Sequence, residues 1–152
     1  MQTITNLEVK KYLKIGSNDT VTINTPDANY CMYSEDFILG EGYKNFKSWL
    51  FRRGIFGWRQ TFDCDNYAEA FRVYLQILHT KAMQKEKDLA KKQSVAFGVI
   101  WFNRDKGGGH AINVFITKDK EGLIHIKYIE PQTGEIVYLS QTELKSIFFI
   151  LL

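Results

Sequence analysis

The chain contains 152 residues, and 45% of them are hydrophobic, 24% charged and 14% aromatic. A chain of this length and composition is sufficient for one folded domain, and it excludes both a disordered chain and most multi-domain layouts. The net charge of +3 is not gathered into one long basic block, so we expect a single domain over residues 1–152 without a nucleic-acid partner.

The sequence carries no recognisable targeting or membrane-spanning signal. Its first eleven residues lack the basic and then apolar regions of a signal peptide. No apolar run approaches the ~20 residues that a helix needs to cross a bilayer. We therefore predict a cytoplasmic protein without a membrane partner, in which Cys31 and Cys64 are free thiols.

The first sixty residues carry short and mixed signals. Val21 and Ile23 alternate with polar residues and predict a brief strand that ends at the turn of residues 25–27. Apolar residues at helical spacing predict a helix over residues 43–51. The aromatic segment that follows, residues 51–62, is expected to pack mainly into the core.

The clearest helical period runs from Cys64 to about Lys87. Thr61 and Asp63 are candidates for the N-cap, because their side-chain oxygens can accept hydrogen bonds from the free N–H groups of the first turn. The apolar stripe of this helix recurs at steps of three and four, in Cys64, Ala68, Phe71, Leu75 and Leu78.

Four strands and a short helix are predicted after the long helix. Turn-rich sequences separate the strands, which we expect at residues 95–102, 111–117, 123–129 and 135–139. Ser140 and Glu143 have the spacing of a capping box that opens a C-terminal helix, whose apolar end at residues 147–152 should pack into the core. A helical N-terminal half followed by antiparallel hairpins predicts the α+β class, with the helix that begins at Cys64 packed on an antiparallel sheet.

Cys64 is the first candidate for chemistry. The thiolate is the nucleophilic form of cysteine, and a helix N-terminus favours it through its dipole and its free N–H groups. A cysteine on an apolar stripe is more commonly a small buried hydrophobe. Cys31 has no helix start beside it and is expected in the core, whereas His79 and His125 are expected on the solvated surface.

His110 and Glu130 are the next candidates. His110 follows three glycines at the start of a predicted strand, on the same face as Ile112 and Val114. Glu130 ends the next strand on the face of Tyr128, where a carboxylate needs a partner such as the ring N–H of His110. If that strand ends earlier, Glu130 faces water instead.

A cysteine at a helix start, a histidine at a strand start and an acid at the end of the next strand match the nucleophile, base and orienting group of covalent acyl transfer. Cys64, His110 and Glu130 are therefore the candidate catalytic residues. The backbone N–H of Cys64 and the side chain of Gln60, with Trp58 as a weaker candidate, would form the oxyanion hole.

Three short blocks resemble a known family. They are Asp63-Cys64-Asp65-Asn66-Tyr67-Ala68, Gly109-His110-Ala111-Ile112-Asn113 and Ile129-Glu130-Pro131-Gln132-Thr133-Gly134. The resemblance is to the papain-like cysteine peptidase domain at the C-terminus of the agglutinin of the fairy-ring mushroom Marasmius oreades, and to its phage and bacterial relatives. It covers residues 62–135 and implies a papain-like fold, a Cys-His-Glu triad at the residues named above, and peptide or amide substrates. Sugar binding is not expected, because the lectin domain of the mushroom protein has no counterpart here.

The resemblance also implies that calcium is required, with Asp65, Asn66 and Gln132 at the matching polar positions. Independently of it, Asp65 and Glu69 lie four residues apart on one helix, where two oxygen ligands could face the same way. Acids in the first turns of a helix also compensate the helix dipole without any metal. An acid at position 130 departs from papain itself, which has an asparagine as the third member.

The sequence therefore predicts a cysteine hydrolase of phage or bacterial type that acts on a protein or peptide. A murein amidase of the NlpC/P60 kind is one alternative, although Asp65 and Asn66 stand where that family has Ser-Gly. A transglutaminase-like transfer would use the same triad. The third alternative is a non-catalytic module that binds a phage or host protein through the aromatic residues near Cys64.

Overall fold

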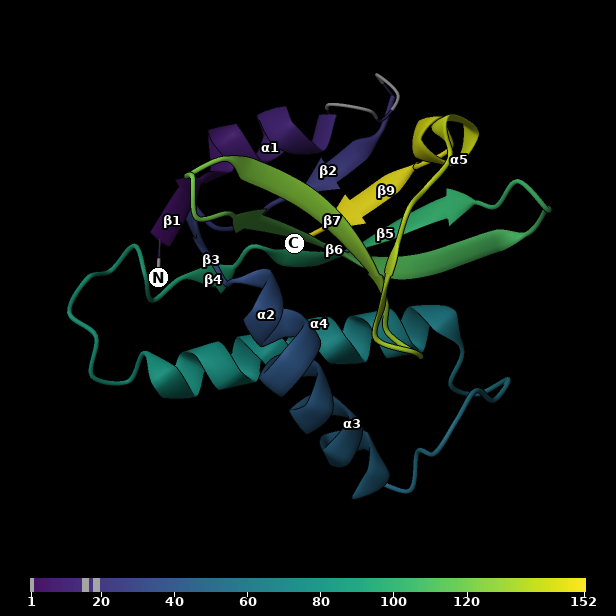
Figure 1. Ribbon diagram of the computed structural model, residues 1–152, viewed down its shortest axis with the longest axis horizontal. Coiled ribbons are helices and arrows are strands. Elements are labelled where there is room, and N and C mark those ends of the chain that lie inside the picture. Colours follow the sequence, from purple (N-terminus) through teal and green to yellow (C-terminus); the bar gives the residue numbers. More distant parts are fainter. Residues whose placement is uncertain (1, 15–16, 18–19) are drawn as a thin grey trace.

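The computed structural model describes residues 2–14, 17 and 20–152, which form two β-sheets and several helices (Figure 1). The strands are β1 (Gln2–Thr5), β2 (Thr22–Asn24), β3 (Asn29–Met32), β4 (Ser94–Val95), β5 (Phe97–Asn103), β6 (Gly109–Lys118), β7 (Ile124–Glu130), β8 (Glu135–Val137) and β9 (Phe149–Leu151). The helices are α1 (Asn6–Lys14), α2 (Glu35–Phe37), the π-helical turn η1 (Ile38–Gly42), α3 (Tyr43–Phe51), α4 (Cys64–Ala82) and α5 (Gln141–Lys145). Within the described ranges, none of these helices has both the length and the apolar character needed to cross a bilayer.

The larger sheet has six strands in the order β2-β9-β5-β6-β7-β8. The four strands from β5 to β8 are consecutive antiparallel neighbours, and β9 adds antiparallel to β5. Gly107 and Gly108 both have a φ of +85° and turn the chain from β5 into β6, a conformation that favours glycine. The predicted brief strand around Val21 and Ile23 and those at 95–102, 111–117, 123–129 and 135–139 are confirmed, with small shifts of their ends.

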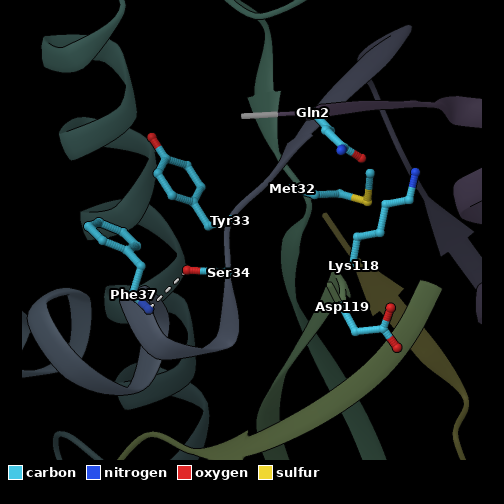
Figure 2. A pocket seen from close by; sticks show the side chains of 7 residues that line it. All are labelled: Gln2, Met32, Tyr33, Ser34, Phe37, Lys118 and Asp119. Carbon is cyan, nitrogen blue, oxygen red and sulfur yellow. Dashed lines mark hydrogen bonds between the residues drawn. The ribbon is translucent and has the colours of Figure 1, made fainter. Parts of the chain in front are cut away.

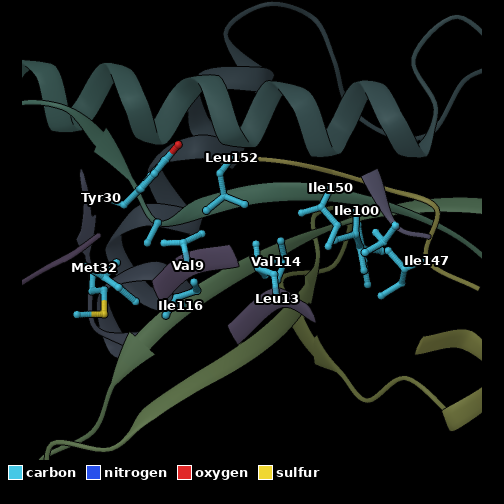
Figure 3. Packing of buried hydrophobic residues seen from close by; sticks show 14 of the residues in the cluster. Val9, Leu13, Tyr30, Met32, Ile100, Val114, Ile116, Ile147, Ile150 and Leu152 are labelled. Carbon is cyan, nitrogen blue, oxygen red and sulfur yellow. The ribbon is translucent and has the colours of Figure 1, made fainter. Parts of the chain in front are cut away.

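One face of this sheet packs against α1. Val9 and Leu13 of α1 join Ile112, Val114 and Ile116 of β6 in the first apolar cluster, shown in Figure 3. These three β6 residues alternate along the strand and therefore point to the same face. Every β6 residue from 111 to 117 is buried, which is the pattern of a strand covered on both faces.

The opposite face packs against α4 through aromatic rings. Phe71 of α4 stacks on Phe46 of α3 at 4.5 Å and meets Phe97 of β5 edge-on at 4.8 Å between ring centroids. Phe115 of β6 belongs to the same cluster. These rings tie α3 and α4 to the sheet.

Helix α4 begins where the sequence predicts. Asp63 is the N-cap residue with extended backbone, and its N–H donates to Oδ1 of Asn66 at 3.3 Å. The helix ends at Ala82, short of the predicted end at about Lys87. Its buried stripe extends as far as His79, and the charged residues after Ala82 have no apolar face to bury.

The predicted fold class, papain-like α+β with a helical N-terminal half, is wrong. Strands β1, β2 and β3 lie within the first 32 residues, and β1, β3 and β4 form a second sheet of three strands. These strands are two to four residues long, and their partners are distant in sequence, as for Tyr30 beside Ser94. Such strands are set by their neighbours in the sheet rather than by local periodicity, and the architecture is dominated by sheet.

The C-terminal segment is a strand rather than the end of a helix. The predicted capping box is confirmed, because the Glu143 N–H donates to Oγ of Ser140 and the Ser140 N–H donates to the Glu143 carboxylate, each at 3.1 Å. Helix α5 then ends at Lys145. Residues 149–151 pair with β5 on one side and with β2 on the other, so the apolar tail completes the large sheet.

Candidate functional site

Cys64 is the first residue of α4 and is a partly buried free thiol. It packs against a small cluster of Ala68, Val99 and Ala111, with Trp101 alongside. Over the described ranges, the Cys64 sulfur takes part in no hydrogen bond. The thiol is thus held at the start of a helix by apolar contacts on the α4 face of the sheet.

His110 and Glu130 form a direct pair. Nε2 of His110, at the start of β6, lies 2.8 Å from Oε2 of Glu130, at the end of β7. Their side chains are 15% and 18% exposed, so water screens the pair only in part. His110 lies opposite Phe102 in the β5–β6 register, and the Phe102 side chain belongs to the α1-side cluster.

The turn after Glu130 is fixed to α3. The backbone carbonyl of Gln132 accepts hydrogen bonds from the Tyr43 hydroxyl at 2.9 Å and from Nζ of Lys47 at 3.2 Å. Gly134 has a φ of +81°, and a Cβ there would collide with the Tyr43 ring. Burial, reinforced by the nearby Glu130 carboxylate, raises the pKa of Tyr43 to about 12.

The structure does not join Cys64 to this pair by a hydrogen bond. His110 shares a sheet face with Phe102 and Ile112, whereas the neighbouring Ala111 points to the opposite face and contacts the cluster of Cys64. The His110–Glu130 contact follows from the predicted strand faces. The helix that carries the thiol packs on the face of Ala111, and among the described residues no hydrogen bond joins Cys64 to His110.

The predicted oxyanion residues lie away from this arrangement. Trp58 is 61% exposed and Gln60 is also exposed, both in the irregular chain between α3 and α4. Neither side chain makes a hydrogen bond within the part of the chain that the structure describes. The observed geometry therefore gives them no fixed orientation toward Cys64.

The acidic start of α4 is the candidate metal centre. Asp63, Cys64 and Asp65 each offer a ligand atom within 4.8 Å of the others. Oδ1 of Asp63 is buried and has no hydrogen-bond partner among the described residues. The adjacent Asp65 carboxyl raises the pKa of Asp63 through a side-chain hydrogen bond and like-charge repulsion, with a contribution from burial. Neither carboxylate forms an ion pair among the described residues.

Of the other predicted metal ligands, Asn66 contacts this cluster, whereas Gln132 and Glu69 make other contacts or lie farther along α4. Asn66 uses its side-chain oxygen to accept the Asp63 N–H, and its own N–H donates to Asp65 at 2.9 Å. Gln132 is engaged by α3 through its carbonyl, and Glu69 is exposed one turn farther along α4. Of the predicted set, the structure places Asp65 in the cluster.

His79 is fully buried, which corrects the expectation of a surface position. Its Nδ1 lies 3.0 Å from the Tyr33 hydroxyl, and burial lowers its pKa. Burial was readable from the stripe of α4, since residue 79 lies four positions after Leu75. His125 is partly exposed and pairs with Asp119 at 2.7 Å, and this hydrogen bond lowers the pKa of Asp119.

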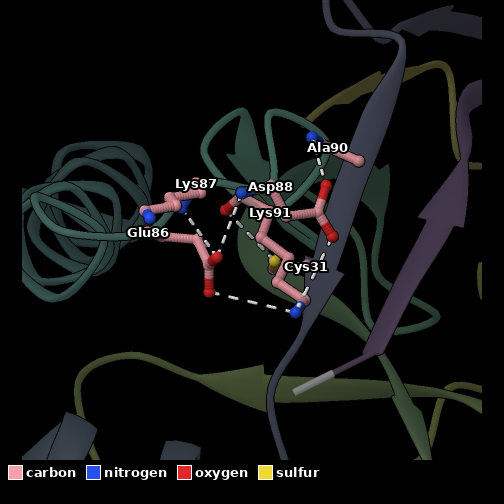
Figure 4. Close-up of polar contacts among 6 residues, drawn as sticks. All are labelled: Cys31, Glu86, Lys87, Asp88, Ala90 and Lys91. Carbon is pink, nitrogen blue, oxygen red and sulfur yellow. Dashed lines mark hydrogen bonds and ion pairs between the residues drawn. The ribbon is translucent and has the colours of Figure 1, made fainter.

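Cys31 is fully buried, as expected. Its thiol lies 3.4 Å from the Lys91 carbonyl, beneath a loop in which Lys91 pairs with Glu86 and Asp88 (Figure 4). Burial raises the pKa of the Cys31 thiol. Both properties fit a structural residue.

A polar groove beside α2 was missed by sequence reasoning. Two adjoining cavities of about 370 Å³ each share Ser34, Lys118 and Asp119 as lining residues. Figure 2 shows the first cavity, where the Lys118 side chain points toward Gln2. The sequence marked residues 118–122 as a turn and gave no sign that α2 would lie beside it.

Comparison with known proteins identifies the family. A family model described as "Agglutinin C-terminal" matches residues 47–136, more than half of the chain. The chain belongs to the agglutinin C-terminal family. This confirms the resemblance to the C-terminal domain of the Marasmius-type agglutinin, while a search of curated proteins finds no match.

Two solved structures share the fold of the whole chain. "PSL1a-E64 complex" matches 99% of this chain with a TM-score of 0.70 and 18% identity. Polyporus squamosus lectin, bound to the human-type influenza-binding epitope Neu5Aca2-6Galb1-4GlcNAc, matches 99% with a TM-score of 0.70 and 19% identity. This chain spans 51% and 49% of those longer chains, so their ligands are properties of longer proteins.

These findings overturn the predicted function. The matching family is described as an agglutinin C-terminal domain, and one structural neighbour is a lectin. The prediction of a cysteine hydrolase or thiol protease, with its papain-like fold, is therefore corrected, and so are its amidase and host-protein-binding alternatives. The neighbour's ligand is a glycan, and the predicted protein or peptide partner is unconfirmed.

Proposed function

We propose that this domain has a lectin-like role and binds an acidic glycan in the polar groove beside α2. The observation that carries the proposal is the pair of adjoining cavities that share Ser34, Lys118 and Asp119. The lectin neighbour and the family support the ligand class. The proposal reverses our expectation from the sequence that sugar binding would not be inherited.

The groove offers the groups that a glycan needs. Ser34, Asp119 and Gln2 supply hydrogen-bonding partners for sugar hydroxyls. Lys118 and Lys120 line the cavities, and neither forms an ion pair among the described residues. Their ammonium groups are available to a carboxylate such as that of a sialic acid.

Calorimetric titration with Neu5Acα2-6Galβ1-4GlcNAc tests the proposal. Lys118→Gln should weaken binding by about tenfold to a hundredfold, because it removes a charge-assisted hydrogen bond. Lys106→Gln, at the exposed tip of the β5–β6 hairpin, is the matched control and should bind like the wild type. Absence of binding at millimolar glycan, or equal loss in both variants, would contradict the proposal.

A second candidate is a thiol site at Cys64 that binds the compound E64. One neighbour was solved as a complex with E64, and it matches this chain over almost its full length. Cys64 is a partly exposed free thiol in the first turn of α4. His110 directly precedes Ala111, which packs in the cluster of Cys64, and its Nε2 lies 2.8 Å from Oε2 of Glu130.

Protection from alkylation tests the thiol site. Iodoacetamide should label Cys64 faster than the fully buried Cys31, and prior incubation with E64 should block the labelling of Cys64. Peptide mass spectrometry reports both positions in one sample, so Cys31 is an internal control. Labelling of Cys64 that is unaffected by E64 would exclude this site.

We further propose that Asp63 and Asp65 hold a calcium ion. The buried, unpartnered Oδ1 of Asp63 and the adjacent Asp65 carboxyl fit a hard cation, which would neutralise the two acids at the start of α4. Asp63→Asn retains an N-cap side chain and should abolish the calcium-induced rise in melting temperature, whereas Glu69→Gln should leave that rise unchanged. Calcium without any effect on the wild-type melting temperature would contradict this site.

A further inference from the structure

The end of α3 and the segment that joins it to α4 expose three large aromatic rings. Phe51 is 66% exposed, Phe56 is 62% exposed and Trp58 is 61% exposed. The sequence predicted that this segment would pack mainly into the core, and for these rings that prediction is wrong. We call residues 51–59 the aromatic–basic loop.

The two phenylalanines of the loop contact each other. Their ring centroids are 5.1 Å apart in an edge-to-face arrangement. Ile55 lies between them in sequence, and together with residues of α3 they line an open hollow of about 520 Å³. Figure 1 shows this segment leaving the end of α3 at the edge of the molecule, on the far side of α3 and α4 from the large sheet.

The same region concentrates positive charge. Residues 43–62 contain five Lys or Arg residues and no Asp or Glu, although the whole chain carries a net charge of only +3. The rest of the chain is therefore net negative. Arg52, Arg53 and Arg59 are exposed in the loop, and within the described residues none of them forms an ion pair.

Contacts within α3 hold the start of the loop in place. Phe46 and Leu50 of α3 are buried in the aromatic cluster under the helix. The Arg53 guanidinium lies over the Trp49 ring at 4.0 Å and donates to the Trp49 carbonyl at 3.1 Å. A partner would therefore meet rings and cations on an ordered helix end.

We propose that the aromatic–basic loop docks this domain onto an anionic membrane surface. Rings of this size partition into the boundary between headgroups and acyl chains, and flanking Lys and Arg residues bind anionic headgroups. A single-stranded nucleic acid is less well matched, because base stacking needs open ring faces, and the edge-to-face contact between Phe51 and Phe56 occupies one of them. The docking is peripheral and independent of the glycan groove, and it replaces our expectation of no membrane partner.

Vesicle sedimentation of the full chain tests the docking. Vesicles containing phosphatidylserine in phosphatidylcholine should bind the protein, and vesicles of phosphatidylcholine alone should not. Arg52→Gln with Arg53→Gln should weaken binding by about 25-fold, from about fivefold for each basic residue near the surface. The matched control is Lys10→Gln with Lys11→Gln, which removes two exposed charges from α1 and should leave binding unchanged.

The rings are tested separately. Phe51→Ala with Phe56→Ala should weaken vesicle binding by on the order of tenfold or more, whereas Tyr138→Ala, at a ring that is 89% exposed elsewhere, should not. Trp58 fluorescence should shift to the blue on anionic vesicles, and Trp58→Phe should remove the shift. Circular dichroism confirms that each variant is folded.

Three outcomes would overturn the proposal. The first is no binding to anionic vesicles, and the second is equal binding to neutral ones. The third is an equal loss of binding in the Lys10 and Lys11 control, which would show a general charge effect. If a single-stranded oligonucleotide binds more tightly than anionic vesicles and competes for the same arginines, the loop is a nucleic-acid surface instead.

Discussion

The two faces of the large sheet are built differently, and the difference explains where polar groups gather. The α1 face is covered by aliphatic side chains, such as Val9, Leu13 and Ile116, and reaches its polar edge at His110 and Glu130. The α4 face is covered by aromatic rings and by the small cluster that includes Cys64. His110 at the start of β6 and Glu130 at the end of β7 form a close polar pair. Cys64 packs with Ala111 on the α4 face and forms no hydrogen bond with this pair among the described residues.

Among the substitutions that distinguish the two faces, one in the aromatic cluster of the α4 face should cause the largest loss of stability. Phe71 is fully buried and contacts rings of α3 and β5. Phe71→Ala should lower the free energy of unfolding by about 3–5 kcal/mol, because it removes the ring and leaves a cavity between α4 and the sheet. Urea denaturation measures the loss. Phe148→Ala, at a ring that is 53% exposed, is the control, and an equal effect of both changes would contradict this account of the α4 face.

Loss of the buried polar contact on the α4 face should cause the second largest decrease in stability. Nδ2 of Asn113 donates to the carbonyls of Ala68 at 2.8 Å and Gly98 at 2.9 Å, fully shielded from water. Asn113→Ala should cost about 1–3 kcal/mol, because it leaves buried acceptors unpaired and opens a small space. Asn103→Ala, at an exposed strand end, should change the urea midpoint little. A smaller loss at Asn113 than at Asn103 would show that this link between helix and sheet is not stabilising.

His79 adds a pH dependence to the α4 face. Its lowered pKa in the folded state means that the unfolded chain takes up a proton at a higher pH than the folded chain does. The free energy of unfolding should therefore decrease as the pH falls below the unfolded value of about 6.5, until the lowered folded pKa is reached. Thermal unfolding at pH 7.5 and pH 5.5 should show a smaller difference in His79→Gln than in the wild type. His125→Gln, at a partly exposed ring, is the control, and an unchanged difference in His79→Gln would contradict the prediction.

Local periodicity predicted α3, the start of α4 and the central hairpins, and strand alternation brought His110 and Glu130 together correctly. The predictions that the structure corrects depended on which face of the sheet packs against which helix. Cys64 packs with Val99 and Ala111 on the α4 face of the sheet, and nothing within one segment encodes which face that is. The same reason explains the exposed rings of the aromatic–basic loop and the short strands of the first 32 residues. A single domain, a cytoplasmic location and calcium binding stay predictions.

The smallest expected effect is a coupling energy between side chains, and it tests most directly how Cys64, His110 and Glu130 are related. A double-mutant cycle with His110→Ala and Glu130→Gln should show a coupling energy of at least about 0.5 kcal/mol, because the two side chains share a 2.8 Å contact. The cycle with His110→Ala and Cys64→Ala should be additive within about 0.5 kcal/mol, since no hydrogen bond joins the two residues in the described structure. Both cycles use urea denaturation and share the His110→Ala variant, so errors in that variant cancel in the comparison. A coupling at Cys64 as large as that at Glu130 would mean that the sheet does not separate the thiol from the pair, and the distinction between the two faces would fail.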